Sequence, residues 1–153
     1  MAMHTWFICK IRYEKVIENG MNKKVTEPYL VDALSFTEAE ARIIEEMTPF
    51  ISGEFTVSDI SRANYSELFP SDEEAADRWF KCKLVFITLD EKSGAEKKTS
   101  TYVLVQGAST EDATTKLHEG MKGTMAEYRI GSVVETPIID VYPYGNEEGS
   151  KEV

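Results

Sequence analysis

The chain has 153 residues, of which 42% are hydrophobic and 29% charged, and its net charge is −10. Its aromatic and β-branched residues exclude a disordered chain, and no apolar run approaches the roughly 20 residues of a membrane span. The opening MAMHTWFICK lacks the basic and apolar regions of a signal peptide, so we expect a cytoplasmic protein with no membrane partner. Two cysteines, Cys9 and Cys82, make no disulfide framework, in keeping with a reducing compartment.

An internal repeat organises the chain. The segment WFICK at Trp6–Lys10 recurs as WFKCK at Trp79–Lys83, and later matches such as Pro70 with Pro143 keep the same offset of 73 residues. A repeat of this kind indicates a duplicated structural unit. The predicted organisation is a first repeat at 1–70, an acidic linker at 71–77, a second repeat at 78–144 and a flexible acidic tail at 145–153.

The first repeat is predicted to contain two strands, a helix and a further β segment. Apolar and polar residues alternate from Phe7 to Tyr13, which is the pattern of a half-buried strand. Ser35 or Thr37 is expected to cap the helix, because a hydroxyl at that position accepts a hydrogen bond from a free helical N–H group. The expected elements are a strand from 6 to 13, a turn at 18–20, a strand at 25–34, a helix ending at 48–49 and a β segment at 54–68.

The second repeat predicts the same elements, with a helix capped by Ser109 or Thr110. They are a strand from 79, a turn at 90–94, a strand at 99–107, a helix ending at Gly120 or Gly123 and a β segment at 127–142. Pro137 predicts an edge position or a bulge. The fold class is therefore α+β, a duplicated β-β-α-β unit with about six mainly antiparallel strands and two helices. The sequence leaves open whether the closing segments pair within their own repeat or exchange.

Charge is distributed unevenly between the paired strands and the rest of the chain. Residues 6–34 hold five basic and four acidic residues, and residues 78–106 hold six and three, so the two hairpins sum to +4. With a total of −10, the rest of the chain carries −14. The net charge argues against nucleic acid, whereas the basic hairpins argue for it, because the local distribution of charge decides phosphate binding.

Alternation in the first strand of each repeat places a tryptophan and two basic residues on one face. Such a face suits single-stranded nucleic acid, since bases stack on rings while cations follow the phosphates. The candidate nucleic-acid-binding residues are Trp6, Lys10, Arg12, Trp79, Lys81 and Lys83. Two purely structural interpretations remain open. The lysines could protect sheet edges from pairing with other strands, and the tryptophans could pack between the two repeats.

No catalytic or metal-binding motif stands out. The chain has no Gly-rich phosphate loop, no GxSxG, HExxH or CxxC, and its two histidines, His4 and His118, have no spacing that supports a zinc site. Cys9 and Cys82 hold equivalent positions on the predicted inward face and are expected to be buried core residues. We therefore expect a protein that is not an enzyme and has no cofactor or bound metal.

The WFICKIRYEK opening, the TEAEAR helix start and the WFKCKL block resemble an uncharacterised family, a domain of unknown function in small proteins from Bacteroidetes and their phages. The resemblance extends over nearly the whole chain and implies no catalytic or binding residues. Occurrence in phages implies an accessory role in replication or recombination.

The sequence favours a non-catalytic single-stranded nucleic-acid-binding protein of phage or mobile-element origin, with single-stranded DNA as ligand and a protein partner at the acidic tail. The alternative is an acidic protein–protein interaction module or DNA-mimic inhibitor, a homo-oligomer through its sheet. A small-molecule binder is a third option.

Overall fold

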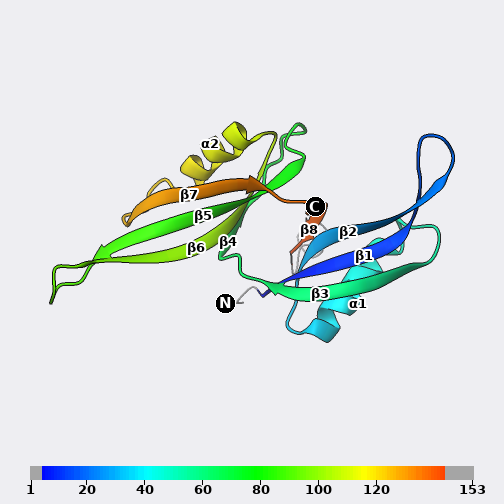
Figure 1. The fold of residues 1–153 in the computed structure, drawn as a ribbon, viewed down its shortest axis with the longest axis horizontal. Coiled ribbons are helices and arrows are strands. Elements are labelled where there is room, and N and C mark those ends of the chain that lie inside the picture. Colours follow the sequence, from blue (N-terminus) through cyan, green and yellow to red (C-terminus); the bar gives the residue numbers. More distant parts are fainter. Residues whose placement is uncertain (1–4, 144–153) are drawn as a thin grey trace, which may run out of the picture. The chain divides into compact units, whose positions relative to one another are not determined.

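The computed structural model describes residues 5–143, which divide into two compact units (Figure 1). Unit 1 contains the residues up to Asn64 and those from Ile138 onward, and unit 2 contains Tyr65–Pro137. Each unit is a four-stranded sheet with one helix against one face, which confirms the α+β class and the duplicated arrangement. The elements are β1 (Trp6–Val16), β2 (Asn22–Asp32), α1 (Phe36–Met47), β3 (Phe55–Ala63), β4 (Glu67–Phe69), β5 (Arg78–Leu89), β6 (Glu96–Gly107), α2 (Thr110–Gly120), β7 (Glu127–Glu135) and β8 (Asp140–Tyr142).

The core of unit 1 lies between α1 and one face of the sheet β3-β1-β2-β8. Alternate residues of β1 point to this face, and α1 contributes residues four positions apart, which lie on one side of a helix. We call this the helix side of the sheet and the opposite side its outer face. The fully or nearly fully buried residues of the helix side are Phe7, Cys9, Ile11, Tyr29, Val31, Ala33, Ala39, Ile43 and Met47.

The core of unit 2 has the same plan, in the sheet β4-β6-β5-β7. Its buried residues are Phe80, Cys82, Leu84, Val103, Val105, Ala113, Leu117 and Met121. Equivalent positions of β1 and β5 are 73 residues apart, but Val31 and Val105 are 74 apart. A gapless alignment would equate Tyr29 with Tyr102, yet Tyr29 lies on the helix side and Tyr102, opposite Lys83, on the outer face. A shift of one residue reverses the face of a strand, so the second hairpin contains one extra residue.

Both helices begin at a serine cap. The Ser35 hydroxyl accepts a hydrogen bond from the Glu38 amide, and the Ser109 hydroxyl accepts one from the Asp112 amide. The acidic side chain in each first turn also accepts a bond from an amide before the helix: the Leu34 amide donates to Glu38 at 2.7 Å and the Ala108 amide to Asp112 at 2.8 Å. These caps confirm Ser35 and Ser109 among the predicted alternatives, and the helices end at Met47 and Gly120 as expected.

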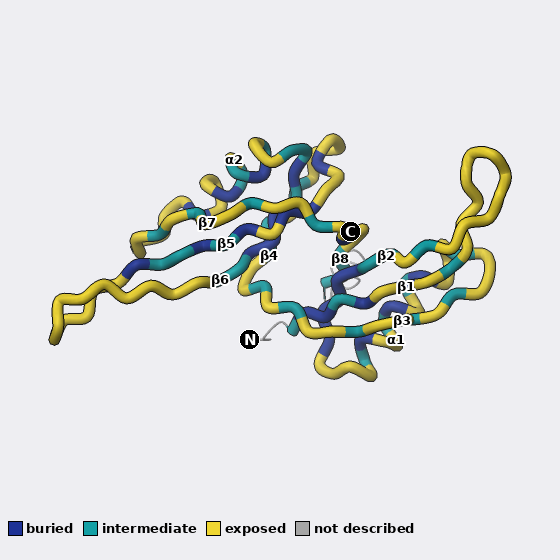
Figure 2. The backbone as a smooth tube through the Cα atoms, in the orientation of Figure 1, coloured by how far each residue is buried: buried dark blue, intermediate teal, exposed yellow. Residues whose placement is uncertain are grey.

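Both hairpins extend beyond the core as exposed tips. Residues 14–24 and 88–100 are exposed throughout, and the tube in Figure 2 is yellow at the tips of the β1–β2 and β5–β6 hairpins. Gly20 and Gly94 have positive φ values of 81° and 72°, which glycine adopts without steric cost. Turns therefore form where the sequence predicted them.

The third strand of each unit contains a bulge at the same place. β3 pairs with β1 and β7 with β5, and the register shifts between Lys10 and Ile11 and between Lys83 and Leu84. The extra residues are Ser58, whose hydroxyl donates to the Lys10 carbonyl, and Gly131. A bulge that recurs in both units is a property of the repeat rather than a local defect.

The repeats exchange their last strands. β4, at the end of the first repeat, pairs in parallel with β6 in unit 2, and β8, at the end of the second, pairs in parallel with β2 in unit 1. Each predicted closing segment is therefore two strands, which raises the predicted six strands to eight. Pro137 lies in the connection between β7 and β8, and the compact units do not coincide with the predicted repeats.

The predicted acidic linker is part of unit 2. Residues 71–77 form no helix, and the Ser71 amide donates to the Gln106 side chain at 2.9 Å. The predicted tail, 145–153, lies outside the described residues.

Candidate nucleic-acid interface

The two tryptophans of the predicted interface are buried. Trp6 and Trp79 are each 5% exposed, and the neighbouring outer-face residues Leu30 and Leu104 are fully buried. Neither ring is therefore available to stack on a base, which corrects the prediction that they form a contact surface. Alternation along a strand indicates which residues share a face but not whether that face is covered, and large rings gain most from being covered.

The four basic residues of the predicted interface lie on the outer faces. Lys10 and Arg12 in β1 are exposed, as is Lys81 in β5, whereas Lys83 is half-buried. All four alternate with core residues, as expected. The structure therefore confirms the predicted outer-face positions of the four basic residues, two in each unit.

The outer face of unit 2 carries a cluster of three cations and one aromatic ring, Lys81, Lys83, Tyr102 and Arg129, which we call the basic patch. Tyr102 lies directly opposite Lys83 in the β5–β6 register, and the Lys81 Nζ lies 4.5 Å from the Tyr102 ring centroid. The outer-face positions among them are uncharged: Val85, Ser100, Leu104, Ser132 and Val134. On the same face, Ile87 lies between Lys98 and Glu127, whose opposite charges cancel. The patch thus places Lys81 and Lys83 next to a half-buried ring, with Arg129 on the other side of β5.

Gly131 leaves room for Lys83 in this patch. A Cβ atom at Gly131 would lie 3.3 Å from the Lys83 Cδ and 3.4 Å from its Cγ. A glycine at the bulge therefore leaves room for the aliphatic stem of Lys83 beside it.

The corresponding face of unit 1 has mixed charge. Lys10 occupies the bulge position that Lys83 occupies in unit 2, but Pro28 and Asp59 lie opposite it instead of Tyr102 and Ser132. Farther along, Glu14 lies opposite Lys24. Acidic neighbours reduce the attraction of this face for phosphate.

A hollow of about 580 Å³ lies beside Arg12 in unit 1. Its other lining residues are Tyr13, Glu14, Asn22, Lys24, Ser52, Gly53, Glu54, Phe55 and Thr56. Cations and carboxylates are balanced there, so the hollow shows no preference for an anion.

A half-buried carboxylate of unit 1, that of Glu27, was missed by sequence reasoning. Both the Tyr13 and Tyr29 hydroxyls donate to Glu27 Oε1, at 2.9 and 3.2 Å, and Lys15 Nζ lies 3.6 Å from Glu27 Oε2. Burial together with Glu27 raises the pKa of both tyrosines. In sequence Glu27 follows Lys23 and Lys24 and looks like an ordinary surface charge.

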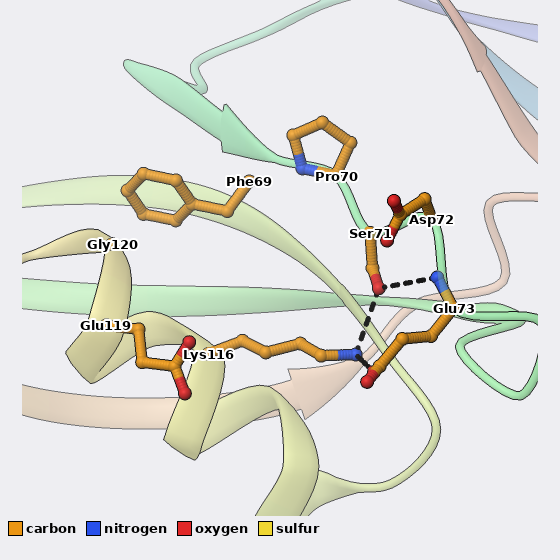
Figure 3. A pocket seen from close by; sticks show the side chains of 8 residues that line it. All are labelled: Phe69, Pro70, Ser71, Asp72, Glu73, Lys116, Glu119 and Gly120. Atoms are coloured by element: carbon orange, nitrogen blue, oxygen red, sulfur yellow. Dashed lines mark hydrogen bonds and ion pairs between the residues drawn. The ribbon is translucent and has the colours of Figure 1, made fainter.

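A second cluster missed by sequence reasoning surrounds Lys116 in α2 (Figure 3). Its Nζ lies 2.5 Å from Glu73 Oε1 and 2.9 Å from Asp112 Oδ2, and donates to the Ser71 hydroxyl at 3.1 Å. These bonds, that to Glu73 foremost, raise the pKa of Lys116. A cavity of about 800 Å³ adjoins the cluster, with Phe69 and Gly120 on its far side. Three acceptors saturate the ammonium group, so its role is to hold residues 71–73 against α2.

The cysteines are core residues, as predicted. Cys9 and Cys82 are fully buried, and burial raises their pKa values to about 12 and about 11, so both remain thiols at neutral pH. Within residues 5–143, no three His, Cys, Asp or Glu side chains are grouped so that they could hold a metal ion. Neither helix of this part of the chain has the length and apolar character needed to cross a membrane.

Comparison with known proteins identifies the family. The model of "Domain of unknown function (DUF4494)" matches residues 5–144, which is almost the entire chain. The protein belongs to this family. Comparison with curated proteins and with solved structures found no match. The family assignment confirms the resemblance to a domain of unknown function and assigns no site.

Proposed function

We propose that the protein is a non-catalytic single-stranded nucleic-acid-binding protein whose contact surface is the basic patch of unit 2. The observation that supports it is the ring of Tyr102 beside Lys81 and Lys83, with Arg129 on the opposite side of β5, on a face with no acidic residue among them. Stacking of a base on an aromatic ring contributes about 1–3 kcal/mol, and the cations would pair with neighbouring phosphates.

The contact between Lys81 and Tyr102 suits this role. Lys81 is exposed and held over the ring by a cation–π contact, which is weak at an exposed site. A base that stacks on Tyr102 would take the place of the ammonium group, which would then be free to pair with a phosphate. Lys10 and Arg12 of unit 1, beside acidic neighbours, would contribute less.

The resemblance to proteins of Bacteroidetes and their phages extends the proposal to a biological setting. Single-stranded DNA is exposed during replication and recombination, and a protein of this kind would act there as an accessory of a phage or mobile element. The acidic tail would serve a protein partner.

Fluorescence anisotropy of a labelled oligo-dT of about 15 nucleotides tests the proposal, at about 50 and 200 mM salt. We expect binding that weakens steeply with salt, and a loss of about 100-fold in affinity for Lys81→Glu/Lys83→Glu. The matched control is Lys23→Glu/Lys122→Glu, which changes net charge equally but lies off the outer face. No binding at the lower salt, or equal losses in both variants, would overturn the assignment.

A second series separates stacking from charge. Tyr102→Leu is expected to weaken binding by about tenfold or more at both salt concentrations, whereas Tyr102→Phe keeps the ring and retains binding. If the two variants behave alike, Tyr102 does not stack on a base and the patch acts by charge alone.

An acidic protein–protein interaction module is the second candidate, favoured by the burial of both tryptophans and by acidic residues on the exposed sides of the helices. These include Glu40, Glu45, Glu111 and Glu119. Light scattering would detect a homo-oligomer, and Glu40→Lys/Glu45→Lys should abolish an interaction that depends on the acidic side of α1. A monomer that retains its partner in this variant would contradict the second candidate.

A further inference from the structure

The exchanged strands share a four-residue pattern. Glu67–Pro70 reads ELFP and Asp140–Pro143 reads DVYP, an acidic, an aliphatic and an aromatic residue followed by proline. β4 and β8 consist of the first three residues of each pattern. Proline has no N–H group to donate, so strand pairing ends at the aromatic residue in both units.

The two segments occupy equivalent sites. Leu68 pairs with Leu104 and Val141 with Leu30 on the outer faces, while Phe69 pairs with Val105 and Tyr142 with Val31 on the helix sides. Before each strand, a backbone amide donates to the second strand of the sheet: Ser66 to the Tyr102 carbonyl at 2.8 Å and Ile139 to the Pro28 carbonyl at 2.9 Å. The sites thus recognise the same backbone and the same alternation of side chains.

The aromatic residue of each segment inserts beside the helix. Tyr142 stacks on Tyr29 with ring centroids 6.2 Å apart, and burial, with Asp140 and Glu46 nearby, raises its pKa to about 12. Phe69 lies so close to α2 that a Cβ atom at Gly120 would be 2.9 Å from its ring. Both rings extend the hydrophobic core of the unit that receives them.

A basic residue at one helix position anchors the residues after each strand. Arg42 of α1 and Lys116 of α2 are equivalent, each three residues beyond a buried alanine of the core, Ala39 or Ala113. Arg42 Nη2 donates to the Pro143 carbonyl at 3.4 Å, and Lys116 holds Ser71 and Glu73 (Figure 3). The two equivalent sites of the duplicated chain therefore use the same sheet edge and the same aromatic slot, each with a basic residue of the helix beside the residues after the strand.

We propose that the edge of β2 in unit 1 is a docking site for an extended peptide segment of a partner protein, with the pattern acidic, aliphatic, aromatic, proline. In the free protein Asp140–Pro143 occupies the site. Addition of a strand to a sheet edge supplies backbone hydrogen bonds, while the aliphatic and aromatic side chains give specificity. A three-residue strand opens far more easily than the core, so a partner segment can replace it. This site lies on other residues than the basic patch, and either proposal can fail without the other.

The test uses the full chain and a fluorescein-labelled peptide with the sequence of residues 136–143. Tyr142→Ala in the protein weakens the binding of the resident segment to the edge of β2. In the wild-type chain this tethered segment competes with the peptide at about millimolar effective concentration. We therefore expect the variant to bind the peptide about tenfold more tightly than the wild-type chain does. Val141→Ser is a second variant that weakens the binding of the resident segment, and it leaves the Tyr142 ring in place. Circular dichroism checks that each variant is folded.

The matched control is the same peptide carrying the Tyr142→Ala change, which should bind about tenfold more weakly than the native peptide. An unlabelled peptide of residues 64–71, with the pattern of the other repeat, should compete. Equal binding to wild type and both variants, or equal binding of native and altered peptides, would overturn the proposal. So would light scattering that shows the wild-type chain exchanging this segment with a second copy, because the occupant would then be the chain itself.

Discussion

Units 1 and 2 have the same core and different outer faces. Phe7 and Phe80, or Met47 and Met121, fill the same places on the helix side. At the bulge, however, Lys10 lies between Pro28 and Asp59, whereas Lys83 lies between Tyr102 and Ser132. Packing restricts a core position to a few side chains, while an exposed face is free to change. The outer faces of the two units therefore differ in charge: unit 2 has the basic patch, and unit 1 has mixed charge.

The units also differ in how their chain is assembled. Unit 2 is one continuous segment, Tyr65–Pro137, whereas unit 1 is completed by the residues from Ile138 onward. Each is nevertheless closed by a strand of the other repeat. A duplicated sequence thus does not produce two self-contained domains.

The largest expected effects test whether the two cores are equivalent. Ile43→Ala and Leu117→Ala each remove a fully buried side chain from the helix side, and each should lower the free energy of unfolding by about 2–5 kcal/mol. Chemical denaturation measured in single-tryptophan variants, with Trp6 reporting unit 1 and Trp79 unit 2, checks this. The control Ile44→Ala, at a residue 41% exposed, should cost far less. A large loss of unfolding free energy in one unit only would contradict the equivalence of the two cores.

The helix caps offer a smaller test of the same comparison. Ser35→Ala and Ser109→Ala each remove the acceptor of a first-turn amide and should destabilise their own unit by about 1 kcal/mol. Thr37→Ala and Thr110→Ala, at the alternative positions suggested by the sequence, serve as controls in the same denaturation assay. Costs at Thr37 or Thr110 that match those of the serines would contradict the cap assignment.

A third prediction sharpens the difference between the outer faces and rests on the proposed function. Ser132→Asp places in unit 2 the carboxylate that Asp59 supplies in unit 1, beside Lys83. We expect about fivefold weaker oligo-dT binding, because the carboxylate competes with phosphate for the lysine. Ser61→Asp, on the outer face of unit 1, is the matched control. If both substitutions weaken binding equally, the two faces do not differ in function.

The smallest effect concerns alkaline pH. The pKa of Tyr142 is raised to about 12 and those of Tyr13 and Tyr29 are also raised, all three in unit 1, while in unit 2 the pKa of Tyr65 is raised. An unfolded tyrosine loses its proton near pH 10, so raised folded pKa values stabilise the fold below that pH and the benefit is lost as pH rises toward 12. Unit 1 should therefore unfold first on alkalinisation.

Tyrosinate absorbance recorded with Trp6 and Trp79 fluorescence checks this order. Glu27→Gln removes the charge that helps raise the pKa values of Tyr13 and Tyr29, and should shift part of the titration to lower pH. Glu14→Gln, at an exposed carboxylate of the same strand as Tyr13, should leave the titration unchanged. Unfolding of both units at the same pH would contradict the prediction.

The sequence by itself determined the local structure of each repeat. Alternation predicted the strands and which of their residues share a face, the serines predicted the helix starts, and equivalent positions predicted the burial of Cys9 and Cys82. These features depend on residues near one another in the chain, where hydrogen bonding and the periods of helix and strand act directly. The basic residues on the outer faces belong to the same class of prediction.

Only the tertiary structure decided what covers each face and which edge receives each closing strand. Trp6 and Trp79 share a face with lysines in sequence but are buried, and β4 and β8 each join the other repeat. The anchors Arg42 and Lys116 likewise act on residues far away in the chain. Burial and strand exchange depend on which surfaces meet after folding, and the pattern of a single segment contains no information about its distant partner.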